Sequence, residues 1–342
     1  MTSIETGRSL IGDPSQWRMH MYTHSRRAVL TGIAASIVSA RSWAAPDQPL
    51  RIVFPFSAGG AADGTARLVA EHLRGSLARS VIVENITGAG GRIAARAVKD
   101  AQPNGGTLLF ASSSQMTLQP HIHRDLGYDA FDDFIPVSQT AKSEIAFAVG
   151  SQSPIRSIKQ AMHWFKDNPE QALYGSPGTG TAPHFIGLEF GRLAGIDLRH
   201  APYKGTPAAI PDVLAGRIPL YIALTAELIE QHRSGAIRLL ATAEVARSPF
   251  LLDVPTLRES GITIDAPGWF AFYAPARTPG DVVAQLANAI IAATQAPDTR
   301  TKILGMGYEP TGTTSEALRR IQRSDFVRWG DLVKASGFKA EQ

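Results

Sequence analysis

The chain has 342 residues, 44% of them hydrophobic, which is enough for one large domain or two smaller ones with their own cores. It contains no cysteine, and this excludes disulfides, thiolate metal sites and cysteine nucleophiles. Residues 1–44 hold five arginines and two acidic residues, which leaves 29 basic and 28 acidic residues in the rest of the chain. The basic charge is therefore no evidence for nucleic-acid binding.

The N-terminal residues have the layout of a secretory signal peptide. Arg26 and Arg27 precede an apolar run, Ala28 to Ala40, and Ser42-Trp43-Ala44 is a small-x-small cleavage site. The paired arginines favour the twin-arginine route, so we predict a cleaved signal peptide over residues 1–44 and a periplasmic location. An uncleaved membrane anchor is the alternative, although the apolar run is too short for a stable transmembrane helix.

A strand, a turn of small residues and a helix are predicted within residues 51–73. Ile52-Val53-Phe54 is typical of a buried strand, and apolar residues return at helical spacing from Ala66 to Leu73. The first N–H groups of such a helix have no partner inside it, and the helix dipole favours an anion there. Because P-loop and dinucleotide motifs are absent, a small carboxylate fits this turn best. A tight turn without a ligand is the alternative.

Strands and helices continue to alternate along the chain, which indicates an α/β fold. The other predicted strands are 81–83, 107–110, 146–149, 220–223, 237–240 and 267–275. The other predicted helices are 93–98, 158–166, 185–194 and 208–214, followed by further helices to the C-terminus. The strand at 107–110 delivers serines to its carboxyl end, where doubly wound sheets bind ligands, although serines are also turn formers.

A second Gly/Ser/Thr turn, residues 175–184, opens the helix predicted at 185–194. Two such turns, one in each half of the chain, suit a cleft that grips one small anion from both sides. We therefore expect main-chain N–H groups of the two turns, without a matching Lys or Arg, to hold a carboxylate. A third turn, Pro202 to Thr206, precedes another helix.

Short motifs occur along the chain in a definite order. They are Val53-Phe-Pro-Phe56, Gly59-Gly60 with Asp63, Val83-Glu84-Asn85, Gly88-Ala-Gly90-Gly91, Pro103 to Leu109, Tyr128-Asp129, Asp133-Phe134, Pro136-Val137, Pro202 to Gly205, Arg247-Ser248-Pro249, Asp253 to Thr256 and Glu259-x-Gly261. In this order they resemble the Bug family, the periplasmic substrate-binding receptors of tripartite tricarboxylate transporters. The likeness runs from about Pro49 to Gly337.

This resemblance implies two doubly wound α/β domains joined by a two-strand hinge, the type II periplasmic binding protein architecture. Domain 1 would comprise residues 45–145 and 268–342, and domain 2 residues 146–267, with hinge strands at Ala146–Val149 and Trp269–Tyr273. The resemblance also places the ligand in the cleft, held by backbone N–H groups, hydroxyls and bridging water. The site residues that it implies are Ser57, Ala58, Gly59, Gly60, Asp63, Ser112 and Ser113 from domain 1, and Ser176, Gly178, Thr179, Gly180, Thr181 and His184 from domain 2.

Some of these residues have a structural alternative. Asp63 either caps the first helix or touches the ligand, and His184 either donates to a carboxylate or packs. Trp269 is either an apolar wall of the cleft or a core residue. Many relatives have an acidic residue after the strand that ends near Ile222, where it meets a ligand amino group, but this chain has Ala223, which we also predict to line the ligand site. A carboxylate without an amine, with an apolar or aromatic body, is therefore favoured.

We predict an extracytoplasmic solute-binding receptor that captures a small organic carboxylate and delivers it to the membrane permease of a tripartite tricarboxylate transporter. It is expected to be a monomer without a cofactor, and His121-x-His123 lacks the further ligand that a metal needs. A periplasmic sensory co-receptor for a two-component kinase is the alternative, with the same site. A periplasmic enzyme is not expected, because G-x-S-x-G, H-E-x-x-H and P-loop motifs are absent and no catalytic residues are predicted.

Overall fold

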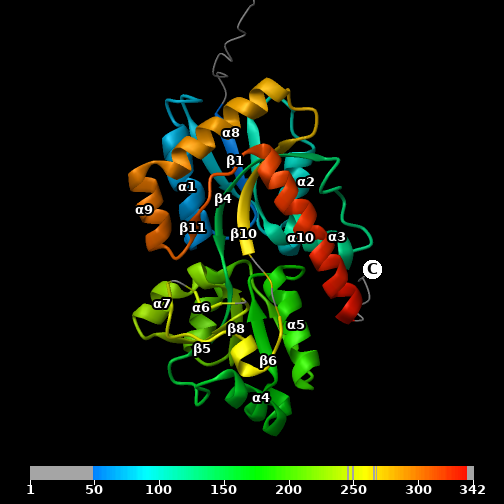
Figure 1. Cartoon of the computed structure of the whole chain (residues 1–342), viewed down its shortest axis with the longest axis vertical. Coiled ribbons are helices and arrows are strands. Elements are labelled where there is room, and N and C mark those ends of the chain that lie inside the picture. The colour runs from blue at the N-terminus through cyan, green and yellow to red at the C-terminus, as the bar shows by residue number, and fades with distance from the viewer. Residues whose placement is uncertain (1–48, 245, 249, 265, 267, 337–342) are drawn as a thin grey trace, which may run out of the picture. The chain divides into compact units, whose positions relative to one another are not determined.

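The structure is a computed structural model and describes residues 49–244, 246–248, 250–264, 266 and 268–336 (Figure 1). The predicted signal peptide lies outside the described residues, as do the motif residues Pro249 and Gly337 and the first residue of the last predicted strand, Pro267. All described residues belong to one compact unit. They form two β-sheets with helices packed on them.

Within the described residues, the first sheet has six strands in the order β11-β4-β10-β3-β1-β2. In that order the strands are Glu309–Pro310, Phe134–Ser143, Gly268–Pro275, Thr107–Ser112, Leu50–Phe54 and Val81–Asn85. The helices of this part are α1 (Ala61–Leu73), α2 (Arg92–Lys99), α3 (Gln119–Ile122), α8 (Gly280–Gln295), α9 (Pro297–Gly305) and α10 (Ser315–Ser336). β1 is parallel to β2 and β3, whereas β10 is antiparallel to β3 and β4. We call this part the first lobe.

The second sheet has five strands among the described residues, in the order β7-β6-β8-β5-β9. They are Arg199–Pro202, Leu173–Ser176, Leu220–Leu224, Ile145–Gly150 and Ile237–Thr242. Its helices are α4 (Ile158–Asp167), α5 (Ala182–Ala194), α6 (Thr206–Leu214) and α7 (Ile229–Arg233). β6 is parallel to β7 and β8, and β5 is antiparallel to β8 and β9. We call this part the second lobe. Short helical turns lie at Ala89–Gly91 (η1), Ser114–Leu118 (η2), Pro169–Gln171 (η3), Thr225–Glu227 (η4) and Arg258–Ser260 (η5).

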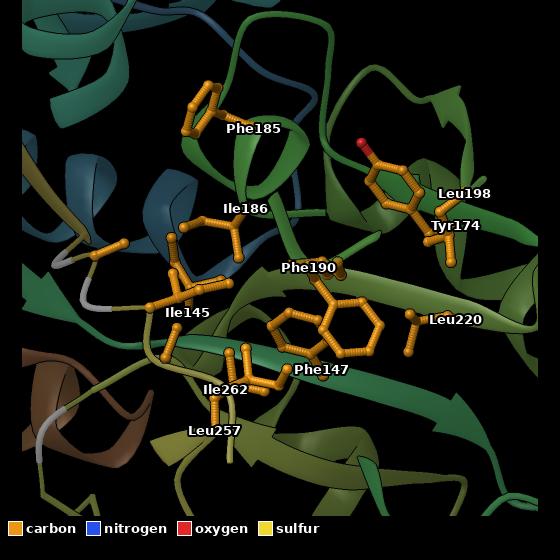
Figure 2. Close-up of a cluster of buried hydrophobic side chains, with 14 of the residues drawn as sticks. Ile145, Phe147, Tyr174, Phe185, Ile186, Phe190, Leu198, Leu220, Leu257 and Ile262 are labelled. Carbon is orange, nitrogen blue, oxygen red and sulfur yellow. The ribbon is translucent and has the colours of Figure 1, made fainter. Parts of the chain in front are cut away.

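The second lobe has a core of apolar side chains between β5 and α5 (Figure 2). Phe147 of β5 and Phe190 of α5 meet with ring centroids 5.1 Å apart. The same core includes Trp329 of α10, which meets Phe185 of α5 edge to face at 5.7 Å. α10 therefore starts on the first lobe and ends against the second, and it joins the two hydrophobic cores.

The strands and helices predicted by residue range are all present, with bounds shifted by three residues or fewer. The structure adds β4, β6 and β7, and the short β11 near the C-terminus. No helix within the described ranges is both long and apolar enough to cross a bilayer.

The chain crosses between the sheets twice, but the first hinge residues differ from the prediction. β5 lies wholly in the second sheet, and the crossing is at Glu144, where β4 of the first sheet runs directly into β5. Ala146–Val149 are therefore sheet residues and not hinge residues. Trp269–Tyr273 are likewise inside β10, paired with both β3 and β4, so the return crossing precedes Gly268.

Candidate ligand-binding site

The turn between β1 and α1 ends at Gly60, the N-cap of α1, which has no capping side chain of its own. The free N–H groups of the first helical turn are instead bound by Glu227 of the second lobe. Its Oε1 accepts from the Ala62 N–H (2.8 Å) and its Oε2 from the Ala61 N–H (3.2 Å). A Cβ at Gly60 would overlap with Glu227 Oε2, so a larger residue there would displace the end of the Glu227 side chain.

The turn between β6 and α5 is bound in the reverse direction. Ser114, which follows β3 in the first lobe, accepts the Ala182 N–H at the start of α5 with its Oγ (2.7 Å). Thr181 is the N-cap of α5 and accepts the His184 N–H (3.4 Å). Each lobe thus caps a helix N-terminus of the other, and the lobes are in contact around the cleft.

Two further contacts join the lobes. The Ser57 N–H donates to the Lys204 carbonyl oxygen (3.0 Å), and Gln119 Nε2 donates to the carbonyl oxygen of Gly180 (3.1 Å). The first bond links the first turn to the third turn. The second bond links α3 to the second turn. The two lobes are therefore in direct contact on several sides of the cleft.

The expectation that both helix N-termini offer free N–H groups to a ligand is wrong for Ala61, Ala62 and Ala182. These three groups already bind protein side chains, Glu227 and Ser114. Helix N-termini do meet at the cleft, and the dipole of α1 does attract a carboxylate, but that carboxylate belongs to the protein. The sequence reasoning missed Glu227 because it considered only residues 223–225 after β8 for an acid.

A pocket with about 570 Å³ of empty space, part of it open to solvent, lies between these contacts. Its hydroxyl lining comes from Ser57, Ser112, Ser113, Ser114, Thr181 and Thr206. Its large apolar side chains are Phe54, Phe56, Leu224, Trp269 and Phe270. Among the described residues that line it, Glu227 alone is ionisable. We call this the cleft pocket.

The structure brings six of the fifteen predicted ligand-binding residues to the cleft pocket. They are Ser57, Gly60, Ser112, Ser113, Thr181 and Trp269. The others do not line it: Ala58, Gly59, Asp63, Ser176, Gly178, Thr179, Gly180, His184 and Ala223. Ala223 is fully buried inside β8. The lining residues that were not predicted as ligand contacts include Thr206 and Glu227, whereas Ser114 belongs to the serine cluster expected at the end of β3 and Phe270 adjoins Trp269 in the predicted wall.

Ser57 and Trp269 reach the pocket in different ways. The Ser57 Oγ is buried and has no hydrogen-bond partner among the described residues, so the hydrogen-bonding capacity of this hydroxyl is unused within the protein. Trp269 is 2% exposed, and its indole N–H donates to Asp325 (2.7 Å). Both alternatives for Trp269 therefore hold: its ring lines the pocket and is also part of the hydrophobic core.

Glu227 is partly buried, and its carboxylate also accepts from the Tyr308 hydroxyl (3.1 Å). Burial raises the pKa of Glu227 above its ordinary value, and the bonds from Ala62, Tyr308 and Ala61 act in the opposite direction. The three donors leave this carboxylate satisfied within the protein.

Asp63 is 3% exposed and is bound within the protein, although it does not cap the N–H groups of the first helix as one of the two alternatives had it. Its oxygens accept from the Gly59 N–H (3.1 Å), Asn85 Nδ2 (2.9 Å) and Arg67 Nε (2.8 Å). Burial by itself raises the pKa of Asp63, but the hydrogen bonds, that from Arg67 first, outweigh burial and leave the pKa below its ordinary value. Asp63 therefore shapes the first turn.

Replacing Asp63 with alanine is expected to lower the free energy of unfolding by about 2–3 kcal/mol, because the Gly59 N–H, Asn85 and Arg67 lose one shared, buried acceptor. Chemical denaturation measures this change. Asp298→Ala is the matched control: Asp298 faces Lys302 with the same i,i+4 spacing but is exposed, so its loss should cost less than about 0.5 kcal/mol. Equal effects of the two substitutions would contradict the structural role of Asp63.

A cluster of histidines lies at the second turn. His184 and His200 stack with ring centroids 4.0 Å apart, His200 Nε2 lies 2.8 Å from Ser176 Oγ, and the Gly180 N–H donates to His184 Nδ1 (3.1 Å). Burial lowers the pKa of His184 and of His123 to about 4, and that of His200 to about 3. His184 therefore packs as a neutral ring in this arrangement.

His121 and His123 are used separately. His121 Nε2 lies 2.8 Å from the Phe326 carbonyl oxygen, whereas His123 faces Gly180 across the lobes. Within the described ranges, no three side chains of the His, Asp or Glu type gather as a metal site.

Two α/β lobes joined by two crossings, with a pocket between them, have the architecture of the periplasmic binding protein fold. The structure of the periplasmic binding protein BugD superposes with a TM-score of 0.82 and 30% identity, and it covers 86% of this chain and 100% of that one. The structure of R. palustris Rpa4515 with adipate has a TM-score of 0.80 and 28% identity, covering 85% and 98%. A UPF0065 protein of Bordetella bronchiseptica is 31% identical over 311 residues, 91% of this chain and 92% of the relative.

Residues 65–338 match the family described as the tripartite tricarboxylate transporter family receptor. The chain belongs to this family, and the prediction of a Bug-like receptor with a two-lobed periplasmic binding fold is confirmed. The family and its solved members are solute-binding proteins.

Proposed function

We propose that the protein is a periplasmic receptor that binds a small organic carboxylate in the cleft pocket and delivers it to the permease of a tripartite tricarboxylate transporter. The observation that carries the proposal is the pocket itself, enclosed by both lobes in a member of this receptor family. Carboxylate binding is supported by Rpa4515, which was solved with adipate at 28% identity to this chain.

The residues proposed to hold the carboxylate are hydroxyl donors. A buried carboxylate needs a donor for each oxygen, and among the described lining residues no Lys or Arg supplies one. The Ser57 Oγ has no partner among the described residues, and Ser112, Ser113 and Thr206 also line the pocket. We therefore assign carboxylate binding to these hydroxyls, bridging water and nearby main-chain N–H groups, in place of the N–H groups of Ala61 and Ala62.

The rest of the proposal concerns export, organisation and partners. We propose that residues 1–44 are a cleaved twin-arginine signal peptide, that domain 1 comprises residues 45–145 with 268–342, and that domain 2 comprises residues 146–267. The receptor would act as a monomer without catalysis, and its closed form would dock on the membrane permease. Ligand contacts made to both lobes at once would favour this closed form.

Thermal-shift screening of the purified mature protein tests the proposal. The panel holds monocarboxylates, dicarboxylates, tricarboxylates, aromatic acids and amino acids. At least one acid should raise the melting temperature, because a ligand present at 100 times its Kd stabilises the folded state by about 2.7 kcal/mol. Calorimetry should then give one ligand per chain without turnover. A panel with no binder, or a ligand that is chemically converted, contradicts the proposal.

Ser57→Ala tests the location of the site. Loss of a hydrogen bond to a charged ligand group should weaken binding of the best acid by about tenfold or more. The control is Ser76→Ala, in which an exposed hydroxyl bonded to the His72 carbonyl oxygen is lost and affinity should not change.

A further inference from the structure

We propose that Glu227 makes the cleft pocket a site for monocarboxylates and excludes ligands with a carboxylate at both ends. This inference rests on the proposed function and names the ligand class of the same pocket. It starts from the position of Glu227, which comes from the second lobe, lines the pocket and binds the first lobe at α1.

The Glu227 carboxylate uses the donors at its end of the pocket. The N–H groups of Ala61 and Ala62 and the hydroxyl of Tyr308 all donate to it. A second ligand carboxylate at this end would therefore find its donors occupied and would be buried without partners. Glu227 thus takes the donors that a second ligand carboxylate beside it would need.

Charge repulsion also disfavours a second ligand carboxylate beside Glu227. A ligand carboxylate beside Glu227 brings two like charges together in a partly buried pocket, and this disfavours the ionised pair. No Lys or Arg among the described lining residues compensates for them. A ligand with a neutral end avoids both penalties.

The remaining lining suits a single carboxylate on an apolar body. The serine hydroxyls at the carboxyl end of β3 offer donors, whereas Phe56, Leu224 and Phe270 offer apolar contact. The rings of Phe56 and Phe270 meet edge to face at 6.4 Å. An apolar chain or ring attached to one carboxylate fits this lining better than a polar body.

Three acids of equal length test the inference by calorimetry with the mature protein. Hexanoate, adipate and 6-aminohexanoate differ only at the end remote from one carboxylate. Hexanoate should bind at least 30-fold more tightly than adipate, and benzoate should likewise exceed terephthalate. Adipate as tight as hexanoate overturns the inference. Tightest binding of 6-aminohexanoate also overturns it, because Glu227 would then be a partner for an ammonium group.

Glu227→Ala supplies the test at the residue. The substitution frees the N–H groups of Ala61 and Ala62, so adipate should gain at least tenfold relative to hexanoate. If this variant does not fold, the nearly isosteric Glu227→Gln is used instead. It removes the charge and must also narrow the difference in affinity between hexanoate and adipate. An unchanged ratio in the folded variant contradicts the assignment.

Glu230→Ala is the matched control. Glu230 is an exposed acid three residues further on, paired with Arg233 at 3.0 Å, and it makes no bond to α1. Its removal changes the net charge equally and should leave the hexanoate-to-adipate ratio unchanged. An equal gain for adipate would assign the effect to general charge and reject Glu227 as the determinant.

The inference and the proposed function fail separately. If dicarboxylates bind and monocarboxylates do not, only the inference is rejected. If no carboxylate binds, the proposed function is rejected together with the inference.

Discussion

Gly90→Ala is expected to weaken ligand binding by about 100-fold while leaving each lobe folded. Gly90 lies in η1 of the first lobe with φ +62°, and an added Cβ would overlap the Thr179 carbonyl oxygen of the second lobe. Gln119 Nε2 bonds the carbonyl oxygens of both Gly90 and Gly180, so this side chain holds the same contact. Alanine would force the two turns apart, and a penalty of about 3 kcal/mol on closure lowers affinity by this factor.

The measurement pairs calorimetry of the best acid with thermal unfolding. Gly195→Ala is the matched control, because Gly195 has φ +64° at the end of α5 but a Cβ there meets nothing within 4 Å. Both variants should lose about 1 kcal/mol of stability from backbone strain, and Gly90→Ala alone should lose affinity. Normal binding by Gly90→Ala would show that ligand capture does not need this contact between the lobes.

The periodic parts of the fold were predictable from sequence because local pattern and burial agree in them. Ile52-Val53-Phe54 is buried in β1, and the small-residue turn that follows leads into α1 as predicted. The prediction for α5 was short by one turn because Ala182 and Pro183 were assigned to the loop. Proline in the first helical turn is compatible with helix, since its missing N–H would have no partner there.

β4 could not be found from hydropathy. Its buried positions include Ser138, Gln139 and Thr140, which read as a polar loop in sequence. In the structure, the Gln139 N–H donates to Thr313 Oγ1 (2.9 Å) and the Thr311 N–H to the Thr140 carbonyl oxygen (3.0 Å). These partners come from residues about 170 positions away, so the burial of β4 depends on tertiary contacts that no local pattern contains.

Glu227 was hidden for a related reason. In sequence, Glu227 looks like one more acid on the exposed face of a short helix. Glu230, three residues further on, is such an exposed acid. What distinguishes Glu227 is the α1 N-terminus of the other lobe, 165 residues earlier in the chain. A lone N-cap glycine without a capping side chain was the available signal, because its helix needs an acceptor from elsewhere.

Stability is expected to fall by about 2–4 kcal/mol between pH 6.5 and pH 5, because of the histidines at the second turn. His123 and His184 have a pKa near 4 and His200 near 3 in the fold, below the 6.5 of an unfolded chain. The unfolded chain therefore binds protons first as the pH falls. The full stability is present above pH 6.5 and is lost as the pH drops toward the folded-state values.

Denaturant unfolding at a series of pH values measures this loss, and two variants assign it. His184→Asn keeps an acceptor for the Gly180 N–H but removes one titrating ring, so the slope between pH 6.5 and pH 5 should become shallower. His163→Gln is the matched control, because it removes an exposed ring on α4 that lies outside this cluster and whose Nδ1 is 2.7 Å from the Lys159 carbonyl oxygen. Since His123 belongs to the first lobe and His184 to the second, their protonation places like charges across the contact that closes the cleft. Ligand affinity should therefore weaken over the same pH range, and an affinity that stays constant while stability falls would place the proton-linked loss within one lobe.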